Sequence, residues 1–484
     1  MKPKTWRKHH KWFGLIICFF LLMFSLSGII LNHRSLFSSI DISRSVLPHW
    51  YKYSNWNGGL MRGTVPYESS ILIYGSNGIW QTDSLGTTVK DFNNGLPKGA
   101  DRRNIRRIVK TSDTLIAASQ FGVYIYNKGI WNKIEINGHK GERITDVALQ
   151  GDSLIVLSRS FVYTATAPYT SFQKLQLAIP DGYKPKVTLF KTVWQLHNGE
   201  LFGMAGKLVV DAIALVIIFL CFTGFFYWLI SKIKKRNFQP STFNFQLRKA
   251  STFCFKWHDK LGRWTIVLTL LLCITGWCLR PPLMVPFVVT KTKPVPGTTL
   301  ASKNKWNDKL RMIAYDEEFG DWLISTSEGF YSFKTLGDKP TKLQGTPPVS
   351  VMGINVFQKD NHGDWLVGSF SGMYVWDRSE SIVLDYYTNE FPIGGHAIAV
   401  AQQAISGYTS DFPEGASPVG YAEGTGVIAQ PEELSTLPMS LWNVALELHT
   451  GRLYIGSSAT MFFVFIAGFF ALWCLWSGWK VRKR

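Results

Sequence analysis

The stretch HKWFGLIICFFLLMFSLSGIILNH, residues 10–33, places one uninterrupted apolar run between two histidines. Its apolar part, Trp12 to Leu31, is near the length that an α-helix needs to cross a bilayer core of about 30 Å. Three later stretches are of the same kind: Leu208 to Ile230, Trp264 to Leu279, which is the shortest, and Ala459 to Trp479. The chain is also 46% hydrophobic and 14% aromatic. We therefore expect an integral membrane protein with four transmembrane helices.

Basic residues gather before the first apolar stretch, between the second and third, and after the fourth. They are Lys2, Lys4, Arg7, Lys8 and Lys11; Lys232, Lys234, Lys235, Arg236, Arg248 and Lys249; and Lys480, Arg482, Lys483 and Arg484. The positive-inside rule then predicts that both termini and the middle loop are cytoplasmic. This distribution accounts for the formal charge of +19 without a nucleic acid partner.

The expected domain boundaries follow from these spans. The N-terminus and first span occupy 1–33, a first exported β segment 34–200, the second span 201–231, a cytoplasmic basic loop 232–262, the third span 263–281, a second exported β segment 282–450, and the fourth span with a cytoplasmic tail 451–484. A cleaved signal peptide is the alternative for residues 1–31, but the long run without a small-x-small site before Asn32 favours an uncleaved anchor. The two exported segments contain no cysteine, so packing without disulfides must stabilise them.

The exported segments contain a recurring strand pair, in which an apolar run, a turn of small residues and an aromatic-rich run follow one another. The copies are Ile71 to Gln81, Leu115 to Tyr126, Leu154 to Thr164, Trp322 to Phe333 and Trp365 to Trp376. A spacing near 40 residues is typical of propeller blades, each of which is one small antiparallel sheet. We predict one propeller-like all-β domain built from both segments, with a β-sandwich of similar hairpins as the alternative. Residues 391–440 do not show the repeat.

Four histidines occupy two duplicated positions. His10-Lys11-Trp12-Phe13-Gly14 matches His258-Asp259-Lys260-Leu261-Gly262, and Leu196-His197-Asn198-Gly199 matches Leu448-His449-Thr450-Gly451. The helices therefore form two pseudo-repeats of two. Neutral imidazole is a good ligand for haem iron, and two histidines from different helices can clamp one haem between them. We predict an inner haem held by His10 and His258, and an outer haem held by His197 and His449.

Other readings of these positions stay open. His33 competes as an outer ligand because it directly follows the first span, although its repeat counterpart is Pro281. Interfacial histidines can also simply place their rings at the headgroup region. Small-residue motifs at Ser27-Gly28, Thr223-Gly224 and Thr275-Gly276 favour close helix packing, or room for a flat macrocycle. The remaining candidates, His49, His139, His362 and His396, have no ligand spacing and are expected at the surface or in turns.

The sequence HKWFG before a span that ends in SGIILNH, followed by an exported domain and LHNGELFG, resembles the PepSY-associated transmembrane family. The resemblance covers all four spans. It implies a bacterial inner-membrane protein whose duplicated histidines carry two b-type haems. Some members are iron-regulated reductases that release iron from ferric siderophores on the periplasmic side. Outside the membrane the chain departs from the family pattern, with blade-like repeats in place of a PepSY module.

Two functional hypotheses follow. The first is a membrane haem-dependent ferric reductase that passes electrons from a quinol or a cytoplasmic reductase to a siderophore-like ferric chelate. The alternative is a non-enzymatic receptor or sensor whose propeller-like domain binds a ligand. The inside loop of about 30 residues offers no output domain for a sensor. A transporter is disfavoured because few polar residues lie at mid-membrane depth.

Overall fold

This computed structural model describes residues 2–236, 242–350, 352–392 and 404–481. The chain divides into two compact units. The helical unit comprises residues 1–37, 185–301 and 441–484, and the β unit comprises residues 38–184 and 302–440. Each unit is therefore assembled from segments that lie far apart in the sequence, and both predicted exported segments contribute to the same β unit.

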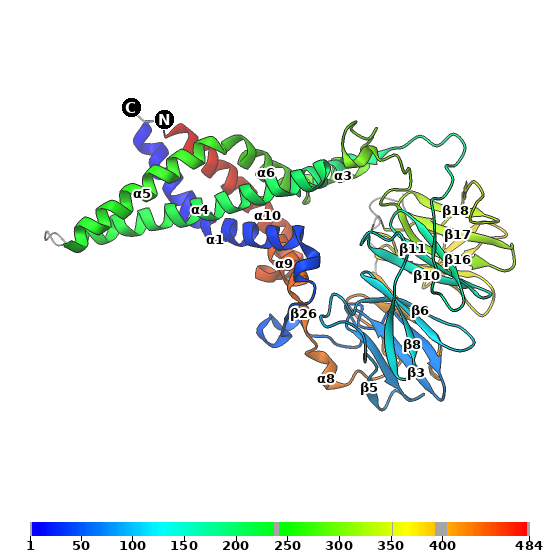
Figure 1. The fold of residues 1–484 in the computed structure, drawn as a ribbon. Helices are drawn as coiled ribbons and strands as arrows, with labels where there is room; N and C mark the ends of the chain where they lie inside the picture. The colour runs from blue at the N-terminus through cyan, green and yellow to red at the C-terminus, as the bar shows by residue number, and fades with distance from the viewer. Residues whose placement is uncertain (1, 237–241, 351, 393–403, 482–484) are drawn as a thin grey trace. The chain divides into compact units, whose positions relative to one another are not determined.

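The helical unit is built on five long helices: α1 (Pro3–Asn32), α4 (Gly203–Arg236), α5 (Thr242–Trp264), α6 (Ile266–Cys278) and α10 (Arg452–Lys480). Shorter elements join them: α2 (Arg34–Phe37), α3 (Leu189–His197), η3 (Glu200–Phe202), α7 (Met284–Val289), α9 (Leu441–Thr450) and the strand pair β14 (Val187–Thr188) and β15 (Lys291–Thr292). Helix α1 contacts α4, α9 and α10, while α6 contacts α3 and α10. Helix α4 packs along α5 with the opposite chain direction (Figure 1).

Three helices among the described residues are long and apolar enough to cross a membrane: Pro3–Asn32, Glu200–Ile233 and Ala459–Lys480. The predicted third span is less regular, because Phe245–Trp264 and Ile266–Cys278 meet at a bend of 68° and form a fourth span only if taken together. The predicted basic loop 232–262 is a helix over most of its described length. Lys and Arg mark the cytoplasmic side, but they are also good helix formers, so their presence does not indicate a loop.

Large apolar side chains cover the outside of the helical unit. Val267 is 73% exposed, and Trp264 and Phe462 are each 70% exposed. Where α1 meets α10, the interior contains Ile17 and the small residues Ala467 and Ala471. Small residues inside and large apolar residues outside are typical of helices that pack against one another in lipid.

The β unit contains five four-stranded antiparallel sheets within its described part. Their strands are β2 (Gly63–Tyr67), β3 (Ser70–Gly75), β4 (Gly78–Thr82), β5 (Val89–Asp91); β6 (Ile105–Lys110), β7 (Leu115–Ser119), β8 (Gly122–Asn127), β9 (Ile130–Ile134); β10 (Ile144–Gln150), β11 (Ser153–Ser158), β12 (Val162–Thr166), β13 (Gln173–Leu175); β16 (Leu310–Asp316), β17 (Asp321–Thr326), β18 (Gly329–Phe333), β19 (Thr341–Lys342); and β20 (Ile354–Lys359), β21 (Trp365–Ser369), β22 (Gly372–Asp377), β23 (Ile382–Asp385). The hairpin β24 (Ile405–Thr409) and β25 (Ser417–Gly420) follows, and β1 (Asp41–Ile42) pairs with β26 (Met439–Ser440). In each four-stranded sheet the strands lie in chain order, so hairpin connections suffice.

The five strand pairs predicted from the sequence repeat are confirmed as the two middle strands of these sheets. They form the hairpins β3–β4, β7–β8, β11–β12, β17–β18 and β21–β22. The last two share one register, because Trp322 pairs with Phe333 and Trp365 pairs with Trp376. Of the segment without a visible repeat, residues 404–440 contribute the hairpin β24–β25, and 393–403 lie outside the described residues.

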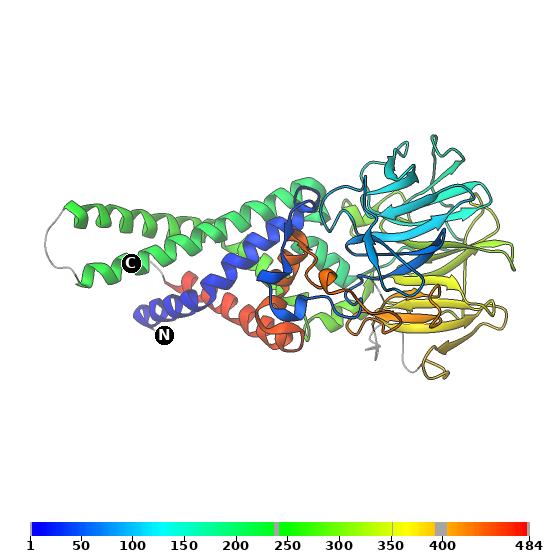
Figure 2. The same ribbon diagram turned by 90° about the horizontal axis from the view of Figure 1, so that it is seen from below.

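The first strands of neighbouring sheets contact one another. Strand β6 contacts β2 and β3, β10 contacts β6, β16 contacts β10, β20 contacts β16, and β24 contacts both β20 and β2. Figure 1 labels β6, β10 and β16, and Figure 2 shows the blue and cyan strands of the first segment in the same unit as the yellow and orange strands of the second. Large aromatic residues fill the layers between the sheets, with Trp131, Trp306, Trp322 and Trp376 almost fully buried. Burying side chains of this size dominates the stability of a core without disulfides.

One arginine joins four of these first strands. From β6, Arg107 donates through Nη1 to Asp146 Oδ2 of β10 at 3.1 Å and to the Ile313 carbonyl of β16 at 3.3 Å. Through Nη2 it donates to the Phe357 carbonyl of β20 at 2.7 Å. Asp146 is fully buried and also accepts the Ile313 backbone N–H at 2.9 Å. The ion pair is therefore a buried polar contact that, with the two carbonyl bonds of Arg107, links the first strands of four sheets.

Candidate functional site: two histidine pairs in the helical unit

Each of the four duplicated histidines contacts a backbone carbonyl of a neighbouring helix through Nδ1. His10 of α1 lies 3.0 Å from the Cys474 carbonyl of α10, and His449 of α9 lies 3.0 Å from the Phe24 carbonyl of α1. A carbonyl oxygen only accepts hydrogen bonds, so Nδ1 must carry the proton. In a neutral ring this tautomer leaves the lone pair on Nε2, the nitrogen that is then available to a metal.

The other two histidines have the same geometry. His197 of α3 lies 3.1 Å from the Leu272 carbonyl of α6, and His258 of α5 lies 3.1 Å from the Leu220 carbonyl of α4. Across the described part of the chain, no hydrogen bond involves Nε2 of these four rings. All four rings therefore combine an anchored Nδ1–H with an Nε2 that has no hydrogen-bond partner among the described residues.

A serine or threonine lies three residues after each acceptor carbonyl. The Oγ of Ser27 is 3.0 Å from Nδ1 of His449, and the Oγ1 of Thr223 is 3.1 Å from Nδ1 of His258. Both hydroxyls donate to carbonyls of their own helix, Met23 for Ser27 at 2.7 Å and Phe219 for Thr223 at 2.8 Å. Their lone pairs can therefore accept the same imidazole proton, which adds a second acceptor to each anchor.

The same position holds Thr275 and Ser477 in the other two sites. Thr275 Oγ1 is 3.2 Å from Nδ1 of His197. Ser477 instead donates to the Cys474 carbonyl at 3.0 Å, the carbonyl that accepts from His10. The hydroxyl thus supports the imidazole directly at three sites and through the carbonyl at the fourth.

A glycine follows each of these hydroxyl residues and lies against the imidazole ring. A Cβ atom on Gly28 would lie 3.4 Å from the ring of His449, and one on Gly224 would lie 3.0 Å from the ring of His258. The corresponding distances are 2.7 Å from Gly276 to His197 and 2.8 Å from Gly478 to His10. At the last two positions any larger residue would have to displace the ring.

These glycines and hydroxyls explain the small-residue motifs of the sequence. Ser27-Gly28, Thr223-Gly224 and Thr275-Gly276 each form the surface on which a histidine rests. The sequence analysis missed Ser477-Gly478, the fourth copy. Its signal was its spacing, because Ser477 follows Thr223 by 254 residues and Thr275 follows Ser27 by 248, close to the repeat length.

The structure brings the histidines together in the predicted pairs. The ring centres of His10 and His258 are 5.9 Å apart with an interplanar angle of 62°. Those of His197 and His449 are 6.0 Å apart with an angle of 54°. Since a metal–imidazole bond is about 2 Å long, one metal between two facing Nε2 atoms separates the ring centres by roughly 6 Å. The donor chemistry and the ring spacing of both pairs thus fit two histidine residues that would hold one haem iron between them.

His33 has a different environment. Its Nε2 is 2.7 Å from Asp211 Oδ2 of α4, and Asn32 Nδ2 donates to the other oxygen of that carboxylate at 2.9 Å. The nitrogen that is unpaired in the other four rings is therefore engaged here. His33, the alternative outer ligand predicted from the sequence, instead links the end of α1 to α4.

The remaining histidines are unrelated to the pairs. His9 lies beside His10, but its Nδ1 accepts from Trp473 Nε1 at 3.2 Å. His139 Nε2 contacts the Glu142 carbonyl at 2.6 Å in a turn, and the His362 backbone N–H is bonded to Asp360 in another turn. His49 lies in the short helix η2 (His49–Tyr51), and His396 lies outside the described residues.

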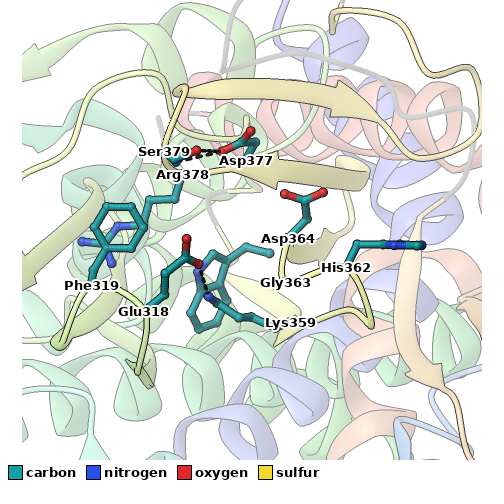
Figure 3. A pocket seen from close by; sticks show the side chains of 10 residues that line it. Glu318, Phe319, Lys359, His362, Gly363, Asp364, Asp377, Arg378 and Ser379 are labelled. Atoms are coloured by element: carbon teal, nitrogen blue, oxygen red, sulfur yellow. Dashed lines mark hydrogen bonds and ion pairs between the residues drawn. The ribbon is translucent and has the colours of Figure 1, made fainter.

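A cavity of about 210 Å³ lies in the β unit and is lined by charged residues (Figure 3). Lys359 pairs with Glu318 at 2.8 Å and with Asp316 at 2.9 Å, and Arg378 contacts Asp316 at 2.8 Å. Both cations are therefore neutralised by carboxylates of the protein itself. This cavity is better explained as an ion-pair network between two sheets than as a binding site.

The histidine contacts cross between the two halves of the chain. His10 of the first half rests on Gly478 of the second, and His197 of the first half rests on Gly276 of the second. Reciprocally, His258 rests on Gly224 and His449 rests on Gly28. Each pair also takes one histidine from each half. Each half of the chain thus supplies the glycine surfaces on which the histidines of the other half rest.

Comparison with solved structures gives matches at low identity. The extracellular domain of a hybrid two-component system of B. thetaiotaomicron is 10% identical with a TM-score of 0.36, over 76% of this chain and 31% of that one. The extracellular domain of a one-component system of B. thetaiotaomicron is 12% identical with a TM-score of 0.35, over 80% and 39%. PorZ, a surface component of the type-IX secretion system of Porphyromonas gingivalis, is 12% identical with a TM-score of 0.31, over 75% and 31%. This chain thus covers 31% to 39% of those chains.

Comparison with curated proteins finds no match. A family model does match, and it does so twice. The model of the PepSY-associated TM region matches residues 1–231 and again residues 229–481, which are the two halves that exchange histidine contacts. The chain belongs to the PepSY-associated transmembrane family.

Proposed function

We propose that this chain is a di-haem electron-transfer protein of the bacterial inner membrane that reduces a siderophore-like ferric chelate on the extracytoplasmic face. The supporting observation is the repeated histidine geometry, in which two rings with anchored Nδ1–H groups and unpaired Nε2 atoms lie about 6 Å apart, twice. One b-type haem would be held by His10 and His258, and one by His197 and His449. Bound haem supplies a one-electron iron couple.

The chain's own residues would orient the ligands. An Nδ1–H bonded to a backbone carbonyl fixes the tautomer and raises the basicity of Nε2. The glycines allow the rings to approach the neighbouring helix closely, and the serine and threonine hydroxyls hold the imidazole planes. The apolar helices around the pairs, in a bilayer, would exclude water, which would favour electron transfer over side reactions at a bound iron.

The positions of the pairs along α1 support a route across the membrane. His10 belongs to one pair, and Gly28, on which His449 of the other pair rests, follows it by 18 residues on the same helix. At 1.5 Å per residue these points are about 27 Å apart along the axis, which approaches the thickness of a bilayer core. With both termini cytoplasmic, as the basic flanks indicate, electrons from a quinol or a cytoplasmic reductase would enter at His10 and His258.

The outer haem is assigned to His197 and His449 in preference to His33. The Nε2 of His33 is bonded to Asp211, whereas the rings of His197 and His449 lie with their centres 6.0 Å apart and bond to backbone carbonyls through Nδ1. In this assignment His33 and Asp211 are a structural link between α1 and α4.

We further propose that the β unit is an exported propeller that binds the chelate. Support comes from the order of sheet contacts, which returns from β24 to β2, and from Arg107, which bonds strands of three other sheets. The propeller would need no edge protection beyond the contact between its first and last sheets.

The test is a reduced-minus-oxidised spectrum of the purified full-length protein and of single variants. We expect two haems in the wild type, loss of one in His10→Ala or His258→Ala, and loss of the other in His197→Ala or His449→Ala. His9→Ala is the matched control, because His9 adjoins His10 but is bonded to Trp473. His33→Ala should retain both haems.

A wild type without a Soret band after haem-sufficient expression would contradict the proposal. The receptor hypothesis would then be the better explanation of a membrane protein with a large β unit. Loss of the outer haem in His33→Ala, with retention in His197→Ala, would reassign the outer ligands alone.

A further inference from the structure

The first strands of five sheets in the β unit carry a β-bulge at the same place. In each, pairing with the second strand skips one residue near the start of the first strand. The skipped residues are Arg106, Thr145, Arg311, Asn355 and Ser406. A bulge turns its side chain out of the regular ladder, so these positions recur at one edge of successive sheets.

Arg62 occupies the equivalent place before β2 in the remaining sheet. Its backbone N–H donates to the Tyr74 carbonyl of β3 at 2.8 Å, and its carbonyl accepts from the Tyr408 N–H of β24 at 3.1 Å. Two of the side chains at these places reach the next sheet in order, whereas Thr145 and Ser406 bond to carbonyls of their own sheets. Arg62 Nη1 approaches the Ile105 carbonyl at 3.5 Å, and Asn355 Nδ2 donates to the Ile405 carbonyl at 2.8 Å.

Arg311 also reaches toward the next sheet, and a second arginine, Arg159, lies near it. A Cβ atom on Gly353, just before the next sheet, would lie 3.0 Å from Arg311 Cδ, so the side chain passes close to that glycine. Arg159 lies at the same edge, because its carbonyl accepts the Leu310 N–H at 2.9 Å. Asp308, paired with Arg159 at 2.6 Å, is the carboxylate that acts on both arginines.

These guanidinium groups have few acceptors in the described part of the protein. Arg311 donates through Nη1 to the carbonyls of Asp308 and Leu310, each at 3.0 Å, while its Nε and that of Arg159 are buried without a hydrogen bond. The side chain of Arg62 makes only the long contact of 3.5 Å. Burial, together with the smaller effect of the nearby charge of Arg159, lowers the pKa of Arg311 to about 10, while the charge of Asp308 acts in the opposite direction. Partly desolvated cations with unused donors are suited to a bound anion.

We propose that Arg62, Arg159 and Arg311 form an anion-binding site at this edge of the β unit, and that its ligand is a ferric chelate with a net negative charge. This inference rests on the proposed function, and it specifies the class of chelate. The planar fork of arginine pairs with carboxylate-type oxygens in a bidentate manner, and several forks at one edge favour a multiply charged ligand over a neutral or cationic one.

The test measures binding to the full-length protein in detergent by calorimetry. The probes are ferric citrate, which is anionic, and a cationic ferric trihydroxamate. We expect ferric citrate to bind more tightly than the trihydroxamate, and its affinity to fall as the salt concentration rises. Arg311→Gln and Arg62→Gln should each weaken ferric citrate binding by about 10-fold or more, since each removes a charge-assisted contact. Arg311→Lys, which keeps the charge but loses the fork, should weaken it less.

Lys339→Gln is the control for net charge. It removes one positive charge from the same unit, but Lys339 is exposed and paired with Asp181. We expect the Lys339→Gln variant to bind ferric citrate with the same affinity as the wild type. Thermal melts and haem spectra of all variants separate a binding defect from misfolding or from loss of the haem sites.

Absence of ferric citrate binding, equal binding of the trihydroxamate, equal binding of iron-free citrate, or unchanged affinity in both glutamine variants would overturn the inference. In each case an intact two-haem spectrum would leave the proposed function standing. Conversely, a protein without haem that still binds ferric citrate through these arginines would overturn the proposed function alone.

Discussion

The helical unit and the β unit both repeat one arrangement, but they repeat it differently. In the helical unit, four sites use the same three components, a histidine, a hydroxyl residue and a glycine. In the β unit, the recurring bulge carries arginine, threonine, asparagine or serine. A repeated position with fixed residues indicates one chemical requirement at every copy. A repeated position with varied residues indicates that the backbone geometry is what recurs. The side chains there can then take different roles.

The largest expected effect comes from a glycine of the helical unit. In Gly276→Val the first added carbon would lie 2.7 Å from the ring of His197, so the ring must move away from its anchor. If each histidine pair holds one haem as proposed, we expect loss of about half the haem, because His197 of one pair is displaced while the other pair is untouched. The haem content of the purified protein measures this.

Gly14→Ala is the matched control, since its Cβ would meet only Cys474 Sγ at an ordinary 3.5 Å. Full haem content in Gly276→Val would show that the site does not require the glycine. The repeated residues of the helical unit would then not reflect one chemical requirement.

The second prediction concerns the central ion pair of the β unit. Arg107→Gln leaves the fully buried Asp146 without its cation, and breaking a buried pair in this way costs about 3–5 kcal/mol. Urea denaturation of the full-length protein, followed by tryptophan fluorescence of the β unit, should show the loss. Lys133→Gln, in an exposed pair with Glu135, should shift the same transition by less than about 0.5 kcal/mol. Equal stability of the two variants would contradict the central role of Arg107.

The third prediction is a pH dependence in the same unit. Burial raises the pKa of Asp146 to about 6, while the charge of Arg107 acts in the opposite direction. An unfolded aspartate has a pKa of about 3.9, so between these values the folded state binds the extra proton and gains stability as the pH falls. From pH 7 to pH 5 the gain from this group is about 1.4 kcal/mol, and it is complete below about pH 4.

The free energy of unfolding at the two pH values, in the wild type and in Asp146→Asn, gives the measurement. The variant cannot bind the proton, so its stability should change less between pH 7 and pH 5. An identical pH dependence in both proteins would assign the effect to another group.

The smallest expected effect is at a bulge position. Thr145 donates to the Leu157 carbonyl at 3.2 Å, so Thr145→Val removes one hydrogen bond at an edge that keeps its backbone pairing. We expect a loss of about 0.5–1.5 kcal/mol and a normal haem spectrum. A loss of stability as large as that in Arg107→Gln would mean that the fold of the β unit also requires particular side chains at the bulges.

Much of the fold follows from local patterns in the sequence. The apolar runs predict the spans because lipid demands length and low polarity, and the strand pairs appear because each hairpin repeats its own alternation of apolar and turn residues. The bend of 68° between α5 and α6 was not predicted. At the bend Thr265 leaves helical backbone geometry, with φ of −100° and ψ of 3°, and no proline within residues 245–278 marks the position.

The candidate site was predictable only in part. Duplication identified His10, His258, His197 and His449, and the structure brings them together in those pairs. The anchors were not visible, because a backbone carbonyl such as that of Cys474 or Leu220 can accept from any residue. The arginine site proposed for the β unit was also hidden, since Arg311 lies in a bulge and Arg62 lies just before β2, and both places are set by strand register rather than by composition.

The exchange of contacts between the halves has a consequence for assembly. Either half alone carries one histidine of each pair and the resting surface for the other half's histidines, so it contains no complete pair. Two separate half-length chains could complete both pairs only by associating about a two-fold axis, and the yield would depend on their concentration. Joining the halves in one polypeptide fixes their ratio at one to one and makes the encounter intramolecular, so every molecule can form both pairs at any dilution.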